Sequence, residues 1–180
     1  NDLWGASEKL DGTSFTAFLN NGEFGVCSRN LELKESDSGA YWRIARQYDI
    51  EKSMRLFGGN FAIQGEIIGE KIQDNIYGVM GQQLYLFSIF NIDTQTYEEL
   101  CTHPFINQFD QFECCPIVME GIDPWCHSID EMLALADGPS KLKRSDGNFP
   151  EREGLVFVSH NDPNTSFKIV SNKFLMKGGN

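Results

Sequence analysis

Glu8-Lys9-Leu10-Asp11-Gly12-Thr13-Ser14 is the stretch that decides the fold and the chemistry of this chain. It sets one lysine between two carboxylates and follows it with a glycine, where backbone can approach a ligand closely. A lysine is nucleophilic only as the free amine, so this position requires neighbours that lower its proton affinity. By itself the string is equally compatible with a solvated turn, because short motifs occur by chance.

Further short motifs follow this stretch in a fixed order. They are Ser28-Arg29 after a strand, Gln64-Gly65-Glu66, Leu86-Phe87-Ser88-Ile89, Glu153-Gly154-Leu155-Val156, and Phe167-Lys168 leading to Lys173. Together with Lys-x-Asp-Gly they resemble, in type and in order, the motifs of the covalent nucleotidyltransferases, which comprise DNA ligases, RNA ligases and mRNA capping enzymes. The resemblance extends over nearly the whole chain.

The connection that follows the second motif narrows the resemblance to one branch. Gly69-Glu70, followed by Ile72-Gln73, Asn75 and Tyr77-Gly78, is similar to the RNA ligases of the Deinococcus and Naegleria type. It favours an RNA ligase over a DNA ligase or a capping enzyme, which remain the near alternatives. In that family an OB domain precedes this one. The resemblance therefore implies that residues 1–180 form a single nucleotidyltransferase domain, with the OB domain outside them.

The activity that this resemblance implies is ATP-dependent RNA ligation for RNA repair. Lys9 would attack the α-phosphorus of ATP and form a lysyl-AMP intermediate, with Mg²⁺ or Mn²⁺ as cofactor. AMP would then pass to a 5′-phosphate end, which is sealed to a 3′-hydroxyl end. The implied partners are ATP, AMP and nicked or broken ends of RNA or of an RNA–DNA hybrid, and the implied state is a monomer.

The resemblance also implies roles for particular residues. Lys9 and Lys168 would be catalytic, Phe87 would stack on the adenine, Glu8 would contact the adenine edge largely through its backbone, and Arg29 would reach ribose or phosphate. The carboxylates Asp11, Glu66 and Glu153 would hold the metal, partly through its water shell. The nucleotide-binding set is Glu8, Lys9, Asp11, Gly12, Ser14, Arg29, Glu66, Phe87, Glu153, Lys168 and Lys173.

Three positions depart from the family pattern. Many relatives carry a second lysine two residues after Lys168, where this chain has Val170, and Lys173 is assigned as its replacement from the next turn. Ser88 stands where many relatives carry aspartate, and Ser14 where some carry asparagine. The assignments of Lys173 and Ser14 depend most on the resemblance.

Composition sets further bounds. A chain of 180 residues that is 41% hydrophobic and 23% charged is typical of one soluble globular domain. No apolar run approaches the roughly 20 residues of a membrane helix, and no signal peptide is evident, so an intracellular protein without membrane contact is expected. A net charge of -11 argues against a nucleic-acid binder. A locally basic active site, or basic surface on a companion domain, would answer that objection.

The cysteines and histidines match no catalytic or metal pattern. The five cysteines contain no Cys-x-x-Cys pair, so reduced thiols are expected and a disulfide framework is not. Cys101, His103, Cys114-Cys115 and Cys126-His127 have the residue types of a zinc site but the wrong spacings. Surface or structural roles are expected for His103, His127 and His160.

The order of elements predicts an α+β fold. Alternation around Asn21-Gly22 predicts a hairpin over residues 13–29, and amphipathic spacing predicts one helix over 41–57. Strands are expected at 61–68, 83–92, 154–159 and 166–170. A capped helix is expected at 128–136 and a helix or tail at 172–177. Residues 96–123 are expected to be irregular with short helices, and residues 140–152 to form a surface loop. We therefore predict mainly antiparallel sheets with flanking helices, as in the ATP-grasp-like catalytic domain of ligases.

One alternative belongs to a different functional class. The chain could be a catalytically silent module that keeps the fold and binds a nucleotide or a protein partner. The combination of Lys9, Asp11, Glu66, Glu153 and Lys168 argues against it, because a silent module has no chemical need for that set.

Overall fold

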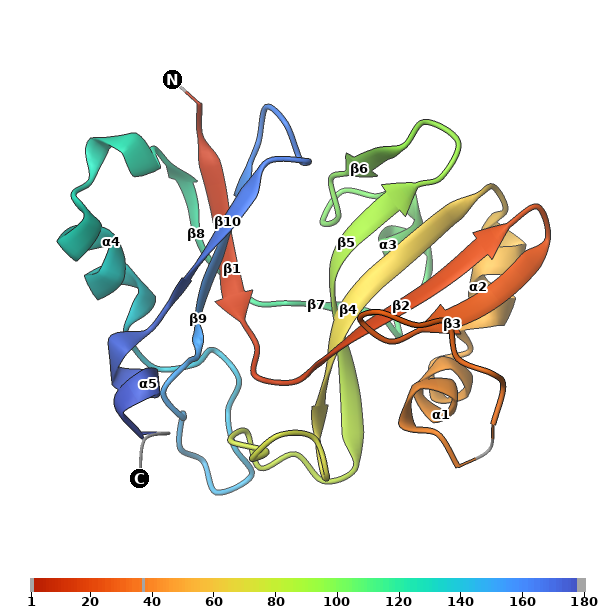
Figure 1. Ribbon diagram of the computed structural model, residues 1–180, viewed down its shortest axis with the longest axis horizontal. Coiled ribbons are helices and arrows are strands. Elements are labelled where there is room, and N and C mark those ends of the chain that lie inside the picture. The colour runs from red at the N-terminus through yellow and green to blue at the C-terminus, as the bar shows by residue number, and fades with distance from the viewer. Residues whose placement is uncertain (1, 37, 178–180) are drawn as a thin grey trace.

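The chain folds into two lobes, each built on one sheet (Figure 1). The computed structural model describes residues 2–36 and 38–177. One lobe holds a four-stranded sheet in the order β10-β9-β1-β8, and the other a sheet in the order β3-β2-β4-β5-β6, whose β5 also pairs with β7. All of these pairings are antiparallel except that of β5 with β7. The predicted α+β class with mainly antiparallel sheets is confirmed.

The two lobes draw on different parts of the chain. The lobe with the four-stranded sheet comprises β1 (Trp4–Lys9), β8 (Ile117–Ile122), the 3-10 helix η1 (Pro124–Cys126), α4 (Ile129–Ala136), β9 (Gly154–Ser159), β10 (Ser166–Val170) and α5 (Asn172–Lys177). The other lobe comprises β2 (Thr13–Asn20), β3 (Glu23–Cys27), α1 (Ala40–Gln47), α2 (Ile50–Phe57), β4 (Phe61–Gly69), β5 (Gln82–Asn91), β6 (Thr96–Glu98), α3 (Pro104–Gln108) and β7 (Glu113–Cys114).

The elements with strong local signals form as predicted. Asn21 and Gly22 take φ angles of 50° and 81°, the left-handed pair that a tight hairpin between β2 and β3 requires. Ser128 caps α4 in a capping box with Glu131. In both cases a few neighbouring residues decide the conformation, and the prediction holds.

The prediction of one helix over residues 41–57 is wrong. Two helices, α1 and α2, cover this range, and they are separated at Tyr48 and Asp49. Asp49 has a φ of 46°, a left-handed conformation that ends a helix. The break turns the chain so that each helix buries its own apolar face, α1 through Ile44 and α2 through Met54.

Residues 96–123 contain more sheet than predicted. The segment includes one short helix, α3, but also β6, β7 and the six-residue strand β8. No residue of β8 is fully buried, so it lacks the clear alternation that marks a half-buried strand. Its pairing with β1, which contains two register shifts, makes it a strand.

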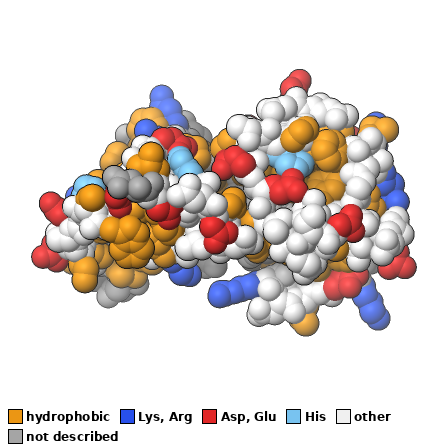
Figure 2. Space-filling view, turned by 90° about the horizontal axis from the view of Figure 1, so that it is seen from above, with side chains coloured by type: hydrophobic (Ala, Val, Ile, Leu, Met, Phe, Trp, Pro, Cys, Tyr) orange, Lys and Arg blue, Asp and Glu red, His pale blue; other side chains and the backbone are white. Residues whose placement is uncertain are grey.

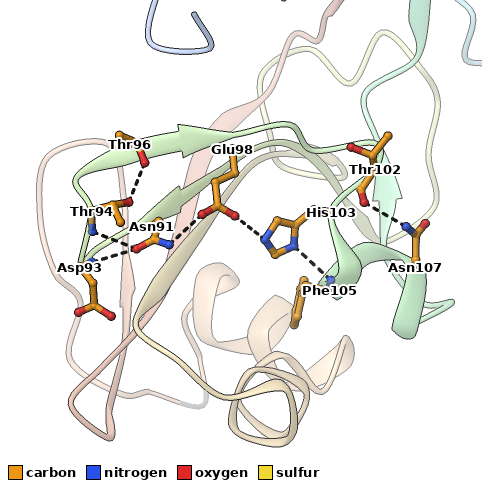
Figure 3. A network of polar contacts seen from close by, with 9 residues as sticks. All are labelled: Asn91, Asp93, Thr94, Thr96, Glu98, Thr102, His103, Phe105 and Asn107. Atoms are coloured by element: carbon orange, nitrogen blue, oxygen red, sulfur yellow. Dashed lines mark hydrogen bonds and ion pairs between the residues drawn. The ribbon is translucent and has the colours of Figure 1, made fainter.

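A polar network holds the turn between β6 and α3 (Figure 3). Glu98 accepts a hydrogen bond of 2.8 Å from the side chain of Asn91 and lies 2.8 Å from His103 Nε2. His103 Nδ1 accepts from the backbone N–H of Phe105 at 3.1 Å and so caps α3. His103 therefore has the structural role expected of it, and residues 98–103 are held at both ends.

Three apolar clusters stabilise the two lobes. The largest packs the six-stranded sheet against α1, α2 and α3, and a second packs the four-stranded sheet against α4. The third lies where the lobes join and consists of Leu10, Ile68, Tyr77, Tyr85 and Cys115. Ile68, Tyr77 and Tyr85 belong to the lobe with the six-stranded sheet, whereas Leu10 and Cys115 lie in the two connections between the lobes. Leu142 of the 140–152 loop packs against them, so this cluster joins the two lobes, and a cleft lies between them.

Candidate active site

The cleft has a volume of about 750 Å³ and is lined by residues of both lobes. Seen from above, acidic side chains gather where the two lobes meet (Figure 2). Of the predicted nucleotide-binding residues, all except Lys173 line this cleft. The fold thus brings together residues that lie as far apart in the sequence as Glu8 and Lys168.

Strand alternation decides what Lys9 and Glu8 face. Along β1, Trp4, Ala6 and Glu8 are buried, whereas Lys9 lies on the opposite face, toward the cleft. β1 is flanked by β8 and β9, and Lys9 pairs with Gly154 of β9. The proposed nucleophile therefore projects from an interior strand whose backbone is held on both sides.

The Glu8 side chain has a structural task. It is 1% exposed, and its Oε2 accepts a 2.7 Å hydrogen bond from the backbone N–H of Lys141. Burial raises the pKa of this carboxyl above its usual range, against the lowering effect of its hydrogen bonds. Glu8 thus ties the 140–152 loop to the back of β1. Its predicted backbone contact with adenine stays a prediction.

Close packing explains the glycine of Lys-x-Asp-Gly. A β-carbon at Gly12 would lie 2.3 Å from the carbonyl oxygen of Ile67 and 2.8 Å from Cγ of Glu66. The turn between β1 and β2 therefore rests directly on β4. Any larger residue would push Lys9 and Asp11 away from Glu66.

Two residues of the 70–81 connection brace this turn. The hydroxyl of Tyr77, which is 1% exposed, accepts a hydrogen bond of 2.8 Å from the backbone N–H of Asp11. The side-chain amide of Gln73 donates to the carbonyl of Gly12 at 3.2 Å. Both residues belong to the connection that resembles RNA ligases, but the sequence predicts no role for them, because no local pattern connects them to Lys9.

Three carboxylates surround Lys9. Its ammonium forms an ion pair with Glu153, and the two side chains are 21% and 17% exposed. Burial raises the pKa of Glu66 to about 7, and Lys9 only partly offsets this effect. Burial also raises the pKa of Asp11, with the charge of Glu153 adding to the shift. The cleft therefore holds more negative charge than Lys9 alone neutralises.

The raised pKa of Glu66 predicts a specific dependence of stability on pH. Between its ordinary pKa of 4.5 and about 7, the folded protein binds a proton that the unfolded chain does not, so the contribution of Glu66 to stability falls as pH rises through this range. Glu66→Gln keeps an acceptor but carries no charge. Both proteins are melted in metal-free buffer with a chelator. We expect the melting temperature of Glu66→Gln minus that of the unmodified protein to increase by a few degrees between pH 4.5 and pH 8. An equal difference at both pH values would contradict the shift.

The carboxylates suit a hydrated cation better than a directly bound one. Among residues 2–36 and 38–177, no three His, Cys, Asp or Glu side chains converge closely enough to hold a metal ion. Asp11, Glu66 and Glu153 instead surround Lys9, and their excess charge would favour an ion that keeps much of its water shell. Their predicted role as metal ligands stays a prediction.

A β-bulge turns Phe87 toward the cleft. The pairing of β4 with β5 shifts register between Gln64, opposite Ser88, and Gly65, opposite Leu86, so that Phe87 has no partner. Leu86 is fully buried while the Phe87 ring is 40% exposed and lines the cleft. Beside it, Ser88 donates a hydrogen bond of 2.9 Å to the side chain of Gln64. An exposed ring in a polar cleft is a platform on which a planar group could stack.

The remaining predicted residues take different positions. Lys168 is exposed on the cleft face of β10, and Ser14 lies opposite Glu66 on the neighbouring strand. Arg29, just after β3, is exposed at the cleft. Lys173 lies outside the cleft lining, at the start of α5, where its backbone N–H donates to Asp137. The roles of these four residues stay predictions, and the position of Lys173 does not support its assignment.

The family model for RNA ligases matches residues 2–170. The chain belongs to the RNA ligase family. No curated protein sequence matches the chain significantly.

Solved structures of an RNA ligase from Naegleria gruberi are similar over almost the whole chain. A mutant with ATP and Mn and another with AMP and Mn are each 35% identical to it, with TM-scores of 0.87, and the match covers 98% of this chain and 52% of theirs. The same ligase with PPi gives 35% identity and a TM-score of 0.87, covering 98% of this chain and 51% of that one. The chain thus spans about half the length of these relatives.

These similarities confirm the family and the fold expected from the motifs. The resemblance to Naegleria-type RNA ligases is confirmed, and the two-sheet α+β architecture is that of a nucleotidyltransferase domain of this enzyme family. Within the described part of the chain, no helix is long and apolar enough to cross a membrane.

Proposed function

We propose that this chain is the adenylyltransferase domain of an ATP-dependent RNA ligase, in which Lys9 accepts AMP. The observation that carries the proposal is the position of Lys9. It projects from an interior strand into a cleft that also holds an exposed aromatic ring, Phe87, and a second lysine, Lys168. Similar structures contain ATP, AMP or PPi, which are the substrate and the two fragments of such a reaction.

In the first step a phosphoramidate forms at Lys9. The neutral amine attacks the α-phosphorus of ATP, the N–P bond forms, the bond to the β-phosphate oxygen breaks, and pyrophosphate leaves. Only the free amine is nucleophilic, so the Lys9 ammonium, which forms an ion pair with Glu153, must lose a proton before attack. A hydrated Mg²⁺ or Mn²⁺ near Asp11, Glu66 and Glu153 would supply positive charge that favours the neutral amine and stabilises the phosphate oxygens.

Two further proposals concern the complete reaction. AMP passes from Lys9 to a 5′-phosphate end, and a 3′-hydroxyl of RNA or of an RNA–DNA hybrid then displaces it. Residues 1–180 act as one nucleotidyltransferase domain, with an OB domain, as in similar enzymes, supplying part of the polynucleotide surface. The net charge of -11 supports this division, because basic residues provide most of the affinity for phosphate backbones.

Labelling with nucleotide tests the first step. The chain is incubated with α-labelled ATP and Mg²⁺ or Mn²⁺, and acid-stable label and intact mass are measured. We expect an adduct with the mass of AMP. A parallel incubation with GTP distinguishes a capping-type enzyme, and nicked duplexes with RNA or DNA ends distinguish RNA from DNA ligation. Binding of ATP without any adduct would favour the silent module and overturn the proposal.

Tyr77→Phe is expected to slow adduct formation roughly tenfold, because the Asp11 N–H loses its acceptor and the turn that carries Asp11 is less well positioned. Tyr48→Phe is the matched control. The hydroxyl of Tyr48 accepts from the backbone N–H of Leu84 at 3.1 Å, but Tyr48 lies outside the cleft lining. Each substitution should cost about 1–3 kcal/mol of stability. Only Tyr77→Phe should change the rate constant, measured with saturating ATP, and equal rates in the two variants would contradict the bracing role.

A further inference from the structure

Arg152 is a buried cation next to the candidate site. The residue is 8% exposed, and it directly precedes Glu153, the carboxylate that forms an ion pair with Lys9. A buried charge is costly unless it is paired or hydrogen-bonded. Arg152 does not line the cleft, so contact with a nucleotide does not explain its position. Its burial therefore requires partners elsewhere in the fold.

The guanidinium of Arg152 binds the C-terminal end of α4. Its Nε donates a 3.0 Å hydrogen bond to the carbonyl of Ala136, and its Nη2 donates bonds of 2.7 Å to the carbonyls of Leu135 and Asp137. The last carbonyls of a helix have no partner within it and carry partial negative charge, which a cation stabilises. The last turn of α4 contains no basic residue. Arg152 therefore supplies, from another segment, the donors and the charge that this helix end lacks.

The backbone around Arg152 is bound to the turn that follows α4. The N–H of Arg152 donates to the carbonyl of Gly138 at 3.0 Å, and the Glu151 side chain accepts a 2.7 Å hydrogen bond from the N–H of Gly138. Glu151 also forms an isolated antiparallel bridge with Pro139. A β-carbon at Gly138 would lie 3.2 Å from Arg152 Nη2, so the glycine leaves room for the guanidinium. The segment before Glu153 is thus fixed by both backbone and side-chain contacts.

Strand pairing fixes the other side of Glu153. Gly154, the next residue, pairs with Lys9 on β1 and with Val170 on β10. The carbonyl of Glu153 itself accepts a 2.8 Å hydrogen bond from the N–H of Ser171. Glu153 therefore lies between the strand that pairs with Lys9 and the anchored residue that precedes it. Because both neighbours in the chain are held, its carboxylate has a defined position beside Lys9.

We propose that Arg152 is a positioning residue for the first step, and that its contacts with the end of α4 set Glu153 beside Lys9. This inference rests on the proposed function, in which Lys9 attacks ATP next to Glu153. Arg152 acts through Glu153 and not on the nucleotide. Small displacements of the groups around a reacting centre slow a reaction strongly. Loss of the anchor should therefore lower the rate of attack and leave the binding of ATP nearly unchanged.

Two substitutions test the proposal through the rate of adduct formation. Arg152→Met removes the donors and the charge, whereas Arg152→Lys keeps the charge but not the planar fork, and it carries the test if Arg152→Met does not fold. Rate constants are measured over a range of ATP concentrations, well below the melting transitions of all variants. At saturating ATP, we expect Arg152→Met to react about tenfold and Arg152→Lys about threefold more slowly. The half-saturating ATP concentration should change less than about twofold.

Ser128→Ala is the matched control, because it weakens the opposite end of the same helix. Ser128 caps α4 by accepting a hydrogen bond from the backbone N–H of Glu131. Its loss should lower the melting temperature by a few degrees, whereas the rate constant should stay that of the unmodified chain. If Ser128→Ala slows the reaction as much as Arg152→Lys does, the stability of α4 explains the effect and the proposal is overturned. A folded Arg152→Lys chain that reacts at the unmodified rate also overturns it.

Stability measurements test the positioning without any activity. Lys9→Met, Glu153→Gln and the double variant are unfolded in urea, both in the otherwise unmodified chain and together with Arg152→Lys. Each set gives the coupling free energy between Lys9 and Glu153, which we expect to fall at least about twofold with Arg152→Lys. Equal coupling in both sets overturns the positioning of Glu153. If the unmodified chain forms no adduct, the proposed function fails, whereas the coupling still decides whether Arg152 holds the pair together.

Discussion

Lys9→Ala is expected to abolish formation of the AMP adduct, lowering its rate by at least about 10³-fold. The reason is chemical, because alanine offers no nitrogen to attack phosphorus and no other described lysine occupies its place at the end of β1. The measurement is acid-stable label per chain after incubation with α-labelled ATP, with intact mass as a second readout.

The control for this prediction is Lys52→Ala, which removes an exposed lysine on α2, outside the cleft lining. It should form adduct at the unmodified rate. ATP binding by the Lys9→Ala chain, followed by equilibrium titration, should persist, because Phe87 and Lys168 remain in the cleft. If Lys9→Ala still forms adduct at the normal rate, the nucleophile lies elsewhere. If ATP binding is lost together with the adduct, Lys9 is needed for binding rather than for chemistry alone.

Gly12→Ala is expected to damage both stability and chemistry. The added methyl would lie 2.3 Å from a backbone oxygen of β4, so the turn after Lys9 must move. Overpacking of this kind costs about 1–3 kcal/mol, and thermal melting should show a loss of roughly 2–4 °C for each kcal/mol. Because the displaced turn carries Asp11 and follows Lys9 directly, we expect adduct formation to slow about 100-fold.

Gly39→Ala is the matched control for this substitution. Gly39 precedes α1, and the nearest atom to an added methyl is Ser36 Cβ at 4.0 Å, an ordinary contact. It should change melting less than Gly12→Ala does, and it should leave the rate of adduct formation unaltered. A Gly12→Ala chain that melts and reacts like the unmodified protein would show that the turn can relax away from Ile67 without cost.

The parts of the fold that the sequence predicts are those with local causes. The hairpin from β2 to β3 depends on Asn21 and Gly22, and the start of α4 depends on Ser128 and Glu131, so a few neighbouring residues suffice in each case. The break at Asp49 and the strand β8 could not be predicted in this way. Asp49 adopts its left-handed backbone while α1 and α2 each pack on the sheet, and β8 is a strand because β1 pairs with it.

For the candidate site, too, the sequence predicts one part and leaves another to the tertiary structure. Motif order predicted which residues would meet, and all but Lys173 line one cleft. It did not predict how they are held. The partner of Glu8 lies 133 residues away, and the partner of Asp11 lies 66 residues away. Contacts at such separations leave no periodic signal along the chain.

By itself, the sequence determined the identity and order of the candidate site residues, namely a lysine with carboxylates nearby, an aromatic ring and a second lysine, because these depend on residue type. Only the tertiary structure decided their orientation. The bulge in β5 turns Phe87 out of the core, and close packing of the Gly12 turn on β4 sets Lys9 beside Glu66. The physical reason is that orientation depends on strand register and on backbone contacts between distant segments, which form only when the two lobes are assembled.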